Sequence, residues 1–370
     1  MNNNNNYLTS QLITYIGNKR KLLSFIDETI VDIKSKLRSE KSHLCKDKLD
    51  IFDGFSGSGC VSRLLKSHAS HLIVNDLEGY CQTLSQCYLA NKSKLNLDEI
   101  HYWIDYLNKY KFSCQKVGFI RQNYAPKNDN DIRIGERVFY TNNNARIIDN
   151  VRVLIDKVPI KYKPFVLAPL LVKASIHCNT SGVFKGFHKK NGIGHFGGAG
   201  ENALKRIKGE ITLDYPVFSD YECEITIHQQ DINTLCIPKV DIAYYDPPYN
   251  QHPYGSNYFM LNIINDYDEP EIQNGVSGII KDWNRSPYNS KSKAIVALDY
   301  LIKNTDAKYI VISYNNEGII PVDEFSSILK NYGTYEVKEM EYNTYRGSRN
   351  LSGRNNKVKE MLWVLFKKTS

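Results

Sequence analysis

The segment DIAYYDPPYN, at positions 241 to 250, places a carboxylate, two prolines and an aromatic ring at the end of a short apolar run. The apolar run is typical of a buried strand, and the prolines end it because they have no N–H for a sheet ladder. Pro247 also keeps Asp246 out of the helical region. A rigid carboxylate beside a backbone carbonyl can accept both hydrogens of an amino group, and Tyr249 can stack on a planar ring. Taken alone, the segment is as typical of a turn as of a nucleobase pocket.

A glycine-rich turn, FSGSG at positions 55 to 59, forms a second candidate site. It follows an apolar run that ends in Asp53 and precedes a helical pattern. Glycines let the backbone approach a ligand, and a helix N-terminus favours a negative group. The spacing differs from GxGxxG, which argues against a dinucleotide pyrophosphate. Asp76 ends the next apolar run, where an acid can reach ribose hydroxyls. Asp231 follows the run before DPPY and either accepts the amine of a cofactor adenine or forms a turn.

These acids and glycines are expected at one edge of a doubly wound α/β sheet. Ligands of such sheets bind beyond the carboxyl ends of the strands. The apolar runs predict strands, and the last two of them are expected to close the sheet as an antiparallel pair. The predicted strand segments are 49–52, 71–76, 222–232, 242–245, 307–318, 334–342 and 360–366.

A long insertion interrupts this alternation of strands and helices. Residues 82–222 are mainly helical in pattern, with apolar residues at helical spacing in ARIIDNVRVLIDKV, and the apolar stretch PFVLAPLLV predicts a buried helix. The glycine-rich, aromatic and basic segment 181–200 predicts a loop or hairpin. We therefore expect a catalytic domain of residues 1–80 and 223–370, interrupted by an inserted target-recognition domain of residues 81–222.

Composition limits the class of protein. The chain has 370 residues, 42% hydrophobic and 24% charged, which suffices for one large domain or a core with an insertion. No apolar run is long enough for a membrane span, and no signal-peptide pattern is evident. Eight scattered cysteines without CxxC or zinc spacing indicate free thiols in a cytoplasmic protein and no metal. The initial asparagine run predicts a disordered tail. The net charge of +8 is compatible with a polyanionic partner without requiring one.

The motifs YIGNKRK, FSGSG, VND, QDI and DPPYN occur in this order, with a long insertion before DPPYN. They resemble the motifs of the Dam-like (α-class) adenine-N6-specific DNA methyltransferases. The resemblance covers nearly the whole chain from Tyr7 and includes ISYNNEG and the basic segment YRGSRN. It implies a Rossmann-like, S-adenosylmethionine-dependent fold that transfers a methyl group to N6 of a flipped-out adenine in duplex DNA. The setting that it implies is restriction–modification, with a possible cognate endonuclease, or a phage or mobile element.

The resemblance also implies roles for individual residues. Those implied to bind S-adenosylmethionine are Tyr15, Lys19, Asp53, Phe55, Gly57, Gly59, Asp76 (ribose), Asp231 (adenine) and Asp246. Those implied to hold the target adenine are Asp246, Pro247 and Tyr249. The chain has Gly17-Asn18-Lys19 where Gly-Gly-Lys is commoner in the family, which leaves the role of Asn18 open.

The implied chemistry depends on holding the adenine amine. Its nitrogen is a poor nucleophile because the lone pair is delocalised into the ring. Hydrogen bonds to Asp246 and the Pro247 carbonyl would hold the amine as it pyramidalises, so positioning and electrostatics carry the catalysis, with no metal needed. The base must first leave the duplex, which costs a few kcal/mol, and stacking on Tyr249 would offset about 1–3 kcal/mol of that cost.

Two basic stretches are candidates for DNA contact, chiefly through phosphates. The first lies in the insertion, contains one acid, Glu201, and includes Lys185, Lys189, Lys190, Lys205, Arg206 and Lys208. The second is a Gly/Asn-rich loop with Arg346, Arg349 and Arg354. Each residue taken singly is also compatible with a solvated surface charge.

Three alternatives stay open on sequence alone. Cytosine-N4 methylation uses a similar amine pocket, although the motif order and Asn250 favour adenine. RNA or protein-amide methylation is less compatible with DPPY and with so large an insertion. A catalytically silent DNA-binding module would be expected to lack the acid of DPPY or the glycine turn, and both are present.

Overall fold

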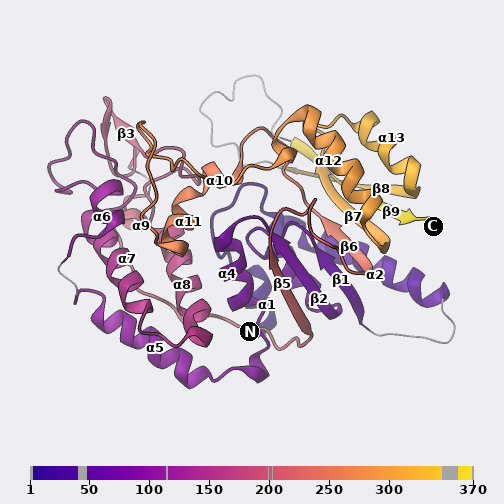
Figure 1. The fold of residues 1–370 in the computed structure, drawn as a ribbon, viewed down its shortest axis with the longest axis horizontal. Helices are drawn as coiled ribbons and strands as arrows, with labels where there is room; N and C mark the ends of the chain where they lie inside the picture. Colours follow the sequence, from indigo (N-terminus) through magenta and orange to yellow (C-terminus); the bar gives the residue numbers. More distant parts are fainter. Residues whose placement is uncertain are drawn as a thin grey trace.

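The computed structural model describes residues 3–40, 48–113, 116–198, 200–201, 203–343 and 357–368. Within this part of the chain, a seven-stranded sheet runs in the order β5-β2-β1-β6-β7-β9-β8 (Figure 1). Its strands are β1 (Leu49–Asp53), β2 (Ala69–Asp76), β5 (Glu224–Gln229), β6 (Val240–Tyr245), β7 (Ala307–Asn315), β8 (Gly333–Asn343) and β9 (Lys357–Lys367).

Strand direction divides the sheet into two parts. The strands β5, β2, β1, β6 and β7 pair in parallel, and β9 runs antiparallel to both β7 and β8. The chain places β2 and β5 on one side of β1 and then returns to place β6 and β7 on the other. The strand order therefore reverses between β1 and β6, which is where ligands of doubly wound sheets bind. The predicted α/β fold and the closing antiparallel pair are confirmed.

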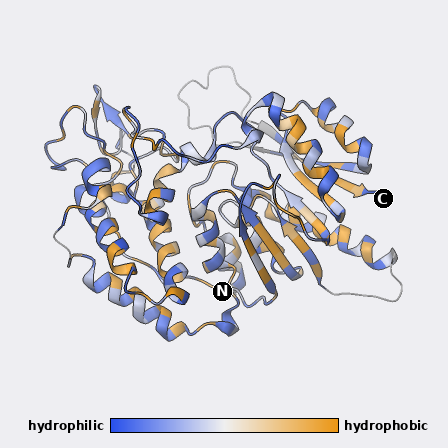
Figure 2. Ribbon diagram, viewed as in Figure 1, coloured by the Kyte–Doolittle hydropathy of each residue, from blue (hydrophilic) through white to orange (hydrophobic). Residues whose placement is uncertain are grey.

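Helices cover both faces of the sheet because its strands are apolar on both faces. Ile242 and Tyr244 of β6 pack on the side of α2 (Leu23–Glu40) and α3 (Cys60–Leu65). Ala243 and Tyr245 alternate to the other side, which is covered by two further helices. These are α12 (Lys291–Asn304) and α13 (Val322–Tyr332). Figure 2 shows the apolar residues concentrated in the central strands.

A helical lobe lies beside this sheet, on the left in Figure 1. Its helices and short strands are α4 (Gly79–Tyr88), α5 (Leu97–Tyr110), α6 (Phe119–Tyr124), α7 (Asn142–Ile155), α8 (Lys163–Ile176), β3 (Lys189–Lys190), β4 (Ile193–Gly194), α9 (Leu204–Lys208), α10 (Tyr254–Asn257) and α11 (Phe259–Asp266). The antiparallel pair β3–β4 confirms the hairpin expected within 181–200. Single-turn 3-10 helices complete the described elements as η1 (Lys19–Leu22), η2 (Lys92–Lys94), η3 (Ile160–Tyr162) and η4 (Pro287–Asn289).

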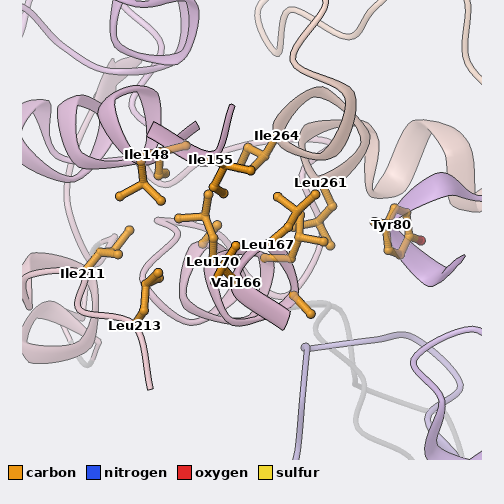
Figure 3. Packing of buried hydrophobic residues seen from close by; sticks show 14 of the residues in the cluster. Tyr80, Ile148, Ile155, Val166, Leu167, Leu170, Ile211, Leu213, Leu261 and Ile264 are labelled. Atoms are coloured by element: carbon orange, nitrogen blue, oxygen red, sulfur yellow. The ribbon is translucent and has the colours of Figure 1, made fainter. Parts of the chain in front are cut away.

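The predicted buried helix is α8, which forms the centre of the lobe. Val166, Leu167 and Leu170 are buried together with side chains of α7 and α11 (Figure 3). Helix α11 follows the DPPY segment in sequence, so the packing of the lobe extends beyond the 81–222 boundary expected for the insertion. That extension depends on contacts between distant segments, which local sequence patterns do not encode. The domain division itself stays a prediction.

The N-terminal asparagine run differs from the expected disordered tail. Residues Asn3–Thr9 form helix α1, and Tyr7 is buried with its hydroxyl donating to the carbonyl of Tyr88 at 2.7 Å. The guanidinium of Arg63, on α3, donates to the carbonyl of Ser10 at 2.8 Å. The expectation was wrong because one buried tyrosine and one buried arginine anchor a segment of low complexity. No helix among the described residues is long and apolar enough to cross a membrane.

Candidate active site

An open pocket lies where the strand order reverses, with about 910 Å³ of empty space in and above it when the adjoining solvent is included. Four of its walls follow the carboxyl ends of parallel strands, namely the segments 54–58 after β1, 75–78 at the end of β2, 230–232 after β5, and 244–248 at the end of β6. Segments 15–19 and 284–289 also contribute to the lining, together with Cys60, Val61, Tyr254 and Gly255. The sheet topology therefore brings together strand ends as far apart in sequence as Gly54 and Asp246, which are separated by 192 residues.

Most of the sequence-predicted cofactor residues line this pocket. Those in the lining are Tyr15, Lys19, Phe55, Gly57, Asp76, Asp231 and Asp246. Asp53, Gly59, Pro247 and Tyr249 lie outside it. The carboxylate of Asp53 is buried behind the glycine turn and accepts a hydrogen bond from the Ser62 hydroxyl at 2.6 Å. Gly59 precedes α3 with φ +73°. The individual roles of all these residues stay predictions.

Asp76 organises the glycine turn. One carboxylate oxygen accepts the N–H of Gly57 at 2.7 Å, and the other accepts the N–H of Glu78 at 3.0 Å. Gly57 has φ +51°, and a Cβ there would lie 2.8 Å from the ring of Tyr15. The turn therefore needs glycine for its backbone conformation and for the close approach of an aromatic ring.

Three tyrosines hold the segment that precedes Lys19. The ring of Tyr15 stacks against both Tyr254 and Tyr258, with centroid distances of 4.9 Å to each, and the latter two rings lie 6.0 Å apart. The hydroxyl of Tyr258 accepts the N–H of Ile16 at 2.7 Å, and that of Tyr254 donates to the carbonyl of Ile16 at 3.0 Å. The residues just after DPPY thus fix the YIGNK segment over the glycine turn.

Asn18 acts as the N-cap of the short helix that carries Lys19. Its side-chain oxygen accepts the N–H of Arg20 at 2.8 Å, which satisfies one free donor of η1. The preceding Gly17 has φ +74°, and a Cβ there would lie 2.7 Å from the hydroxyl of Tyr249. The departure from Gly-Gly-Lys therefore supplies a cap without disturbing the glycine that contacts the DPPY tyrosine.

A buried cluster of charges lies beneath the DPPY motif. The ammonium of Lys19 is 3.1 Å from Asp246 Oδ1 and 2.7 Å from Oε1 of Glu360 on β9. The side chains of Lys19, Asp246 and Glu360 are 3%, 18% and 0% exposed. The ammonium also lies 5.0 Å from the ring centroid of Tyr249. Glu360 was missed in the sequence, where its only signal is an acid at the start of the apolar run EMLWVLF.

Burial dominates the electrostatics of this cluster. It raises the pKa of Asp246 to about 7, while the Lys19 ammonium opposes the rise and Glu360 adds to it. Burial alone would lower the pKa of Lys19, yet the facing carboxylates hold that pKa well above its ordinary value. Burial likewise raises the pKa of Asp53 to about 7. Asp246 therefore becomes a full hydrogen-bond acceptor only around neutral pH and above.

Glu78 is a further acid of the pocket that sequence reasoning missed. It is buried and accepts hydrogen bonds from the side-chain amides of Asn262 at 2.5 Å and Asn284 at 3.2 Å. Burial raises its pKa to about 7. Its two amide partners come from segments about 180 and 200 residues away in sequence, which explains why no local pattern identified it.

The pocket suits an adenosine-type ligand that carries a positive charge. Phe55 packs edge-on against Tyr288 with a centroid distance of 5.2 Å, beside Ile232, and offers apolar surface to a flat ring. The lining acids Asp76, Glu78 and Asp231 can accept from hydroxyl or amino groups. Because these acids and Asp246 outnumber the single lining lysine, the local charge favours a cation such as a sulfonium.

The predicted DNA-contacting residues lie in different surroundings. Lys189 and Lys190 form the exposed strand β3, at the outer edge of the lobe in Figure 1. Lys205 is exposed on α9, and Lys185 is partly buried. Arg206 instead donates to the carbonyls of Ile176 and Cys178, the latter at 2.9 Å, so its guanidinium fixes the end of α8. Arg346, Arg349 and Arg354 lie outside the described residues.

Comparison with known proteins gives a consistent result. Residues 15–328 match the family described as D12 class N6 adenine-specific DNA methyltransferase. The chain is 30% identical over 368 residues to the type II methyltransferase M.NlaIII of Neisseria lactamica, covering 96% of this chain and 99% of that protein. It is 29% identical over 367 residues to the type II methyltransferase M.CviAII of Paramecium bursaria Chlorella virus 1, covering 96% and 98%. Modification methylase LlaI of Lactococcus lactis subsp. lactis is 28% identical over 375 residues, and only 55% of that longer protein is covered.

Proposed function

The chain belongs to the family of D12 class N6 adenine-specific DNA methyltransferases, and we propose that its pocket binds S-adenosylmethionine and that Asp246 holds the adenine to be methylated. The observation that carries this proposal is the position of Asp246. It lies at the end of β6, in the same pocket as the glycine turn and Asp76. Methyltransferases of this family transfer a methyl group to N6 of adenine in DNA, and bound S-adenosylmethionine would supply that methyl group on a sulfonium.

Asp246 and the backbone next to it act on the amine. The carboxylate and the Pro247 carbonyl accept the two amine hydrogens and hold the nitrogen as it pyramidalises, so its lone pair becomes available for attack. Tyr249 offers a ring for stacking beside them. Two contacts hold the ring of Tyr249 in place. It lies over the Lys19 ammonium, and it packs edge-on against Tyr314 with 5.9 Å between ring centroids. Positioning of this kind lowers the barrier without a change in the chemistry of the base.

The depth of the site requires that the adenine leave the duplex. A base stacked in a helix cannot reach a carboxylate that is 18% exposed and sits at the end of a central strand. The helical lobe stands beside the pocket and carries the exposed lysines of β3 and α9 (Figure 1). We infer that this lobe binds the duplex while the extruded base enters the pocket.

The similarity to type II methyltransferases supports a biological role. Relatives of the chain include M.NlaIII and M.CviAII, both named type II methyltransferases. We infer that this chain protects DNA against a cognate restriction endonuclease that recognises the same sequence. DNA modified by the purified chain should then resist at least one endonuclease whose site contains the methylated adenine.

The direct test is product analysis. The purified chain is incubated with methyl-labelled S-adenosylmethionine and unmethylated duplex DNA, the DNA is digested to nucleosides, and sequencing locates the modified base. N6-methyladenine within one short sequence supports the proposal. N4-methylcytosine would contradict the assignment of the base, and label found on RNA alone would contradict the assignment of DNA as substrate.

The role of Asp246 is tested by Asp246→Asn. The amide lacks the negative charge and carries a donor NH2 group in place of one acceptor oxygen, so methyl transfer should fall by about a hundredfold or more. Binding of S-adenosylmethionine, measured by calorimetry, should weaken far less than methyl transfer, because the lining acids Asp76, Glu78 and Asp231 remain. The matched control is Asp282→Asn, which removes one charge from an exposed position. Methylation by Asp246→Asn at the wild-type rate would remove the basis of the proposed site.

A further inference from the structure

Glu360 is a buried acid whose charged surroundings are not needed for the packing of its strand. It lies on the central strand β9, opposite Asn315 of β7 and Met340 of β8. Its Oε1 accepts the hydroxyl hydrogen of Ser313 at 2.6 Å and lies 2.7 Å from the Lys19 ammonium. Among the described residues, Oε2 has no hydrogen-bond partner although it is buried. A fully buried carboxylate with one unsatisfied oxygen therefore lies directly behind the DPPY motif.

Such a group is not explained by stability. Removing charges from water is costly, and an apolar side chain of similar volume often stabilises a core as well as a buried ion pair does. Here two carboxylates face one ammonium, so the cluster retains a net negative charge at alkaline pH. The other two members of the cluster, Asp246 and Lys19, have raised pKa values, and groups with perturbed pKa values are concentrated at functional sites. The position of Glu360 relative to Asp246 suggests which function it serves.

Lys19 connects Glu360 to Asp246. Asp246 Oδ1 is buried and faces the ammonium, whereas the carboxylate as a whole keeps 18% exposure. An ammonium on a flexible four-carbon chain does not hold a carboxylate in one orientation unless it is itself fixed. The cap formed by Asn18 fixes the backbone that carries Lys19, and Glu360 is the second carboxylate within 4.0 Å of its ammonium among the described residues.

We propose that Glu360 is a positioning residue for methyl transfer, which anchors the Lys19 ammonium against Asp246 Oδ1 and so directs the other carboxylate oxygen toward the adenine amine. This inference rests on the proposed role of Asp246. Ser313 supports the same arrangement, because its hydroxyl donates a hydrogen bond to Oε1 of Glu360, the oxygen that faces the ammonium. Glu360 itself touches neither the pocket nor any reacting group.

The surroundings of Asp246 allow the effect of Glu360 to be isolated. The charged and titratable groups that face it are Lys19 from η1, Asp53 from β1, Cys60 from α3, Tyr244 from β6, Tyr249 and Tyr254 from the DPPY segment and α10, and Glu360 from β9. Besides Asp246, Asp53 and the pocket acid Glu78 have pKa values near 7, and the principal influences on these two do not include Glu360. A change in pH dependence caused by substitution of Glu360 is therefore assigned to Asp246.

The test is Glu360→Gln, with Glu339→Gln as the matched control. Glu339 lies on the neighbouring strand β8 and forms an exposed ion pair with Lys359 at 3.0 Å. In Glu360→Gln, kcat on duplex DNA should fall about tenfold because the neutral amide holds the ammonium less firmly. The acid limb of the kcat profile should move to lower pH, because the charge that raises the pKa of Asp246 is gone. S-adenosylmethionine affinity by calorimetry should change little, and Glu339→Gln should match the wild type.

If Glu360 had only a structural role, Glu360→Gln would lower the melting temperature and leave the acid limb of the kcat profile unmoved. Wild-type kcat together with an unmoved acid limb in Glu360→Gln would overturn the proposal. If that variant does not fold, Ser313→Ala decides, because loss of the hydrogen bond should produce a smaller change in the same two quantities. An unchanged kcat and acid limb in Ser313→Ala would then overturn it. These outcomes are separate from failure of the proposed function, which would appear as absence of N6-methyladenine from the wild-type reaction.

Discussion

The side chain of Asp246 meets two opposing requirements. It must be ionised to accept hydrogens from an amine, yet it lies at the end of a central strand where burial favours the protonated form. The Lys19 ammonium at 3.1 Å partly restores the ionised form. This ion pair accounts for the burial of Lys19, at 3% exposure, directly beside the proposed catalytic acid. The ionisation of Asp246 therefore depends on the balance between its desolvation and its ion pair with Lys19.

This balance predicts the pH dependence of methyl transfer. A carboxyl group with a raised pKa holds its proton up to a higher pH, so below about 7 most Asp246 side chains are protonated and accept the amine hydrogen poorly. The kcat on duplex DNA should therefore rise with pH through about 7 and become constant above it. In Lys19→Met, loss of the ammonium should lower kcat and move the acid limb to higher pH. Steady-state kinetics between about pH 5.5 and 9 measures both, and a flat profile in this range would contradict the assignment.

At the scale of elements, the glycine turn couples two binding segments. Gly57 is tied to the end of β2 through Asp76 and lies directly under the ring of Tyr15. The Tyr15 ring is in turn stacked against both Tyr254 and Tyr258. Displacement of the turn would therefore be transmitted to the segment that carries Lys19.

Gly57→Ala tests this coupling. An alanine at φ +51° is strained by about 1–2 kcal/mol, and its Cβ would lie 2.8 Å from the Tyr15 ring. We expect the dissociation constant for S-adenosylmethionine, measured by calorimetry, to rise about tenfold or more. Gly59→Ala is the matched comparison, because it has φ +73° but no atom within 4 Å of the added Cβ. Gly59→Ala should bear the backbone strain alone and weaken binding less. Equal effects of the two variants would show that the contact with Tyr15 does not matter.

The sequence predicted those elements whose signals are local. Alternation of apolar runs and glycine turns indicated the parallel strands, and the order of motifs indicated that Asp53, Asp76 and Asp246 meet at one edge of the sheet. It did not reveal Glu360 or Glu78, because each is defined by partners that are far away in sequence. It left Asn18 open, since a cap on a single turn of 3-10 helix has almost no sequence signature. The N-terminal helix was missed because one tyrosine, Tyr7, anchors it.

In the whole molecule, the pocket and the lysines proposed to contact DNA lie in different parts. The sheet and its helices carry the pocket, while the lobe carries the hairpin β3–β4 and helix α9 (Figure 1). The two parts are joined by more than the insertion points, because Tyr258 packs with the lobe core and also accepts the N–H of Ile16 at the pocket. A change in the lobe on DNA binding could thus reach the segment that carries Lys19. The predicted boundaries of the insertion could not include this connection, which arises after the DPPY motif.

The hairpin lysines test how the whole molecule binds DNA. The double substitution Lys189→Glu and Lys190→Glu reverses two exposed charges on the lobe. If both lysines contact phosphates, DNA affinity at low salt should fall about tenfold or more, and the slope of log affinity against log salt should become shallower by about two. The control double substitution, Lys303→Glu and Lys330→Glu, makes the same change in net charge at exposed sites on α12 and α13, on the opposite side of the molecule (Figure 1). Affinity for a short duplex is measured by fluorescence anisotropy, and S-adenosylmethionine affinity should be unchanged in both doubles. Overall positive charge attracts DNA wherever it lies, so a general electrostatic effect would weaken binding equally in the two double variants. If the lobe contacts the duplex, the loss of affinity and of salt dependence should be confined to the variant with substitutions in the hairpin.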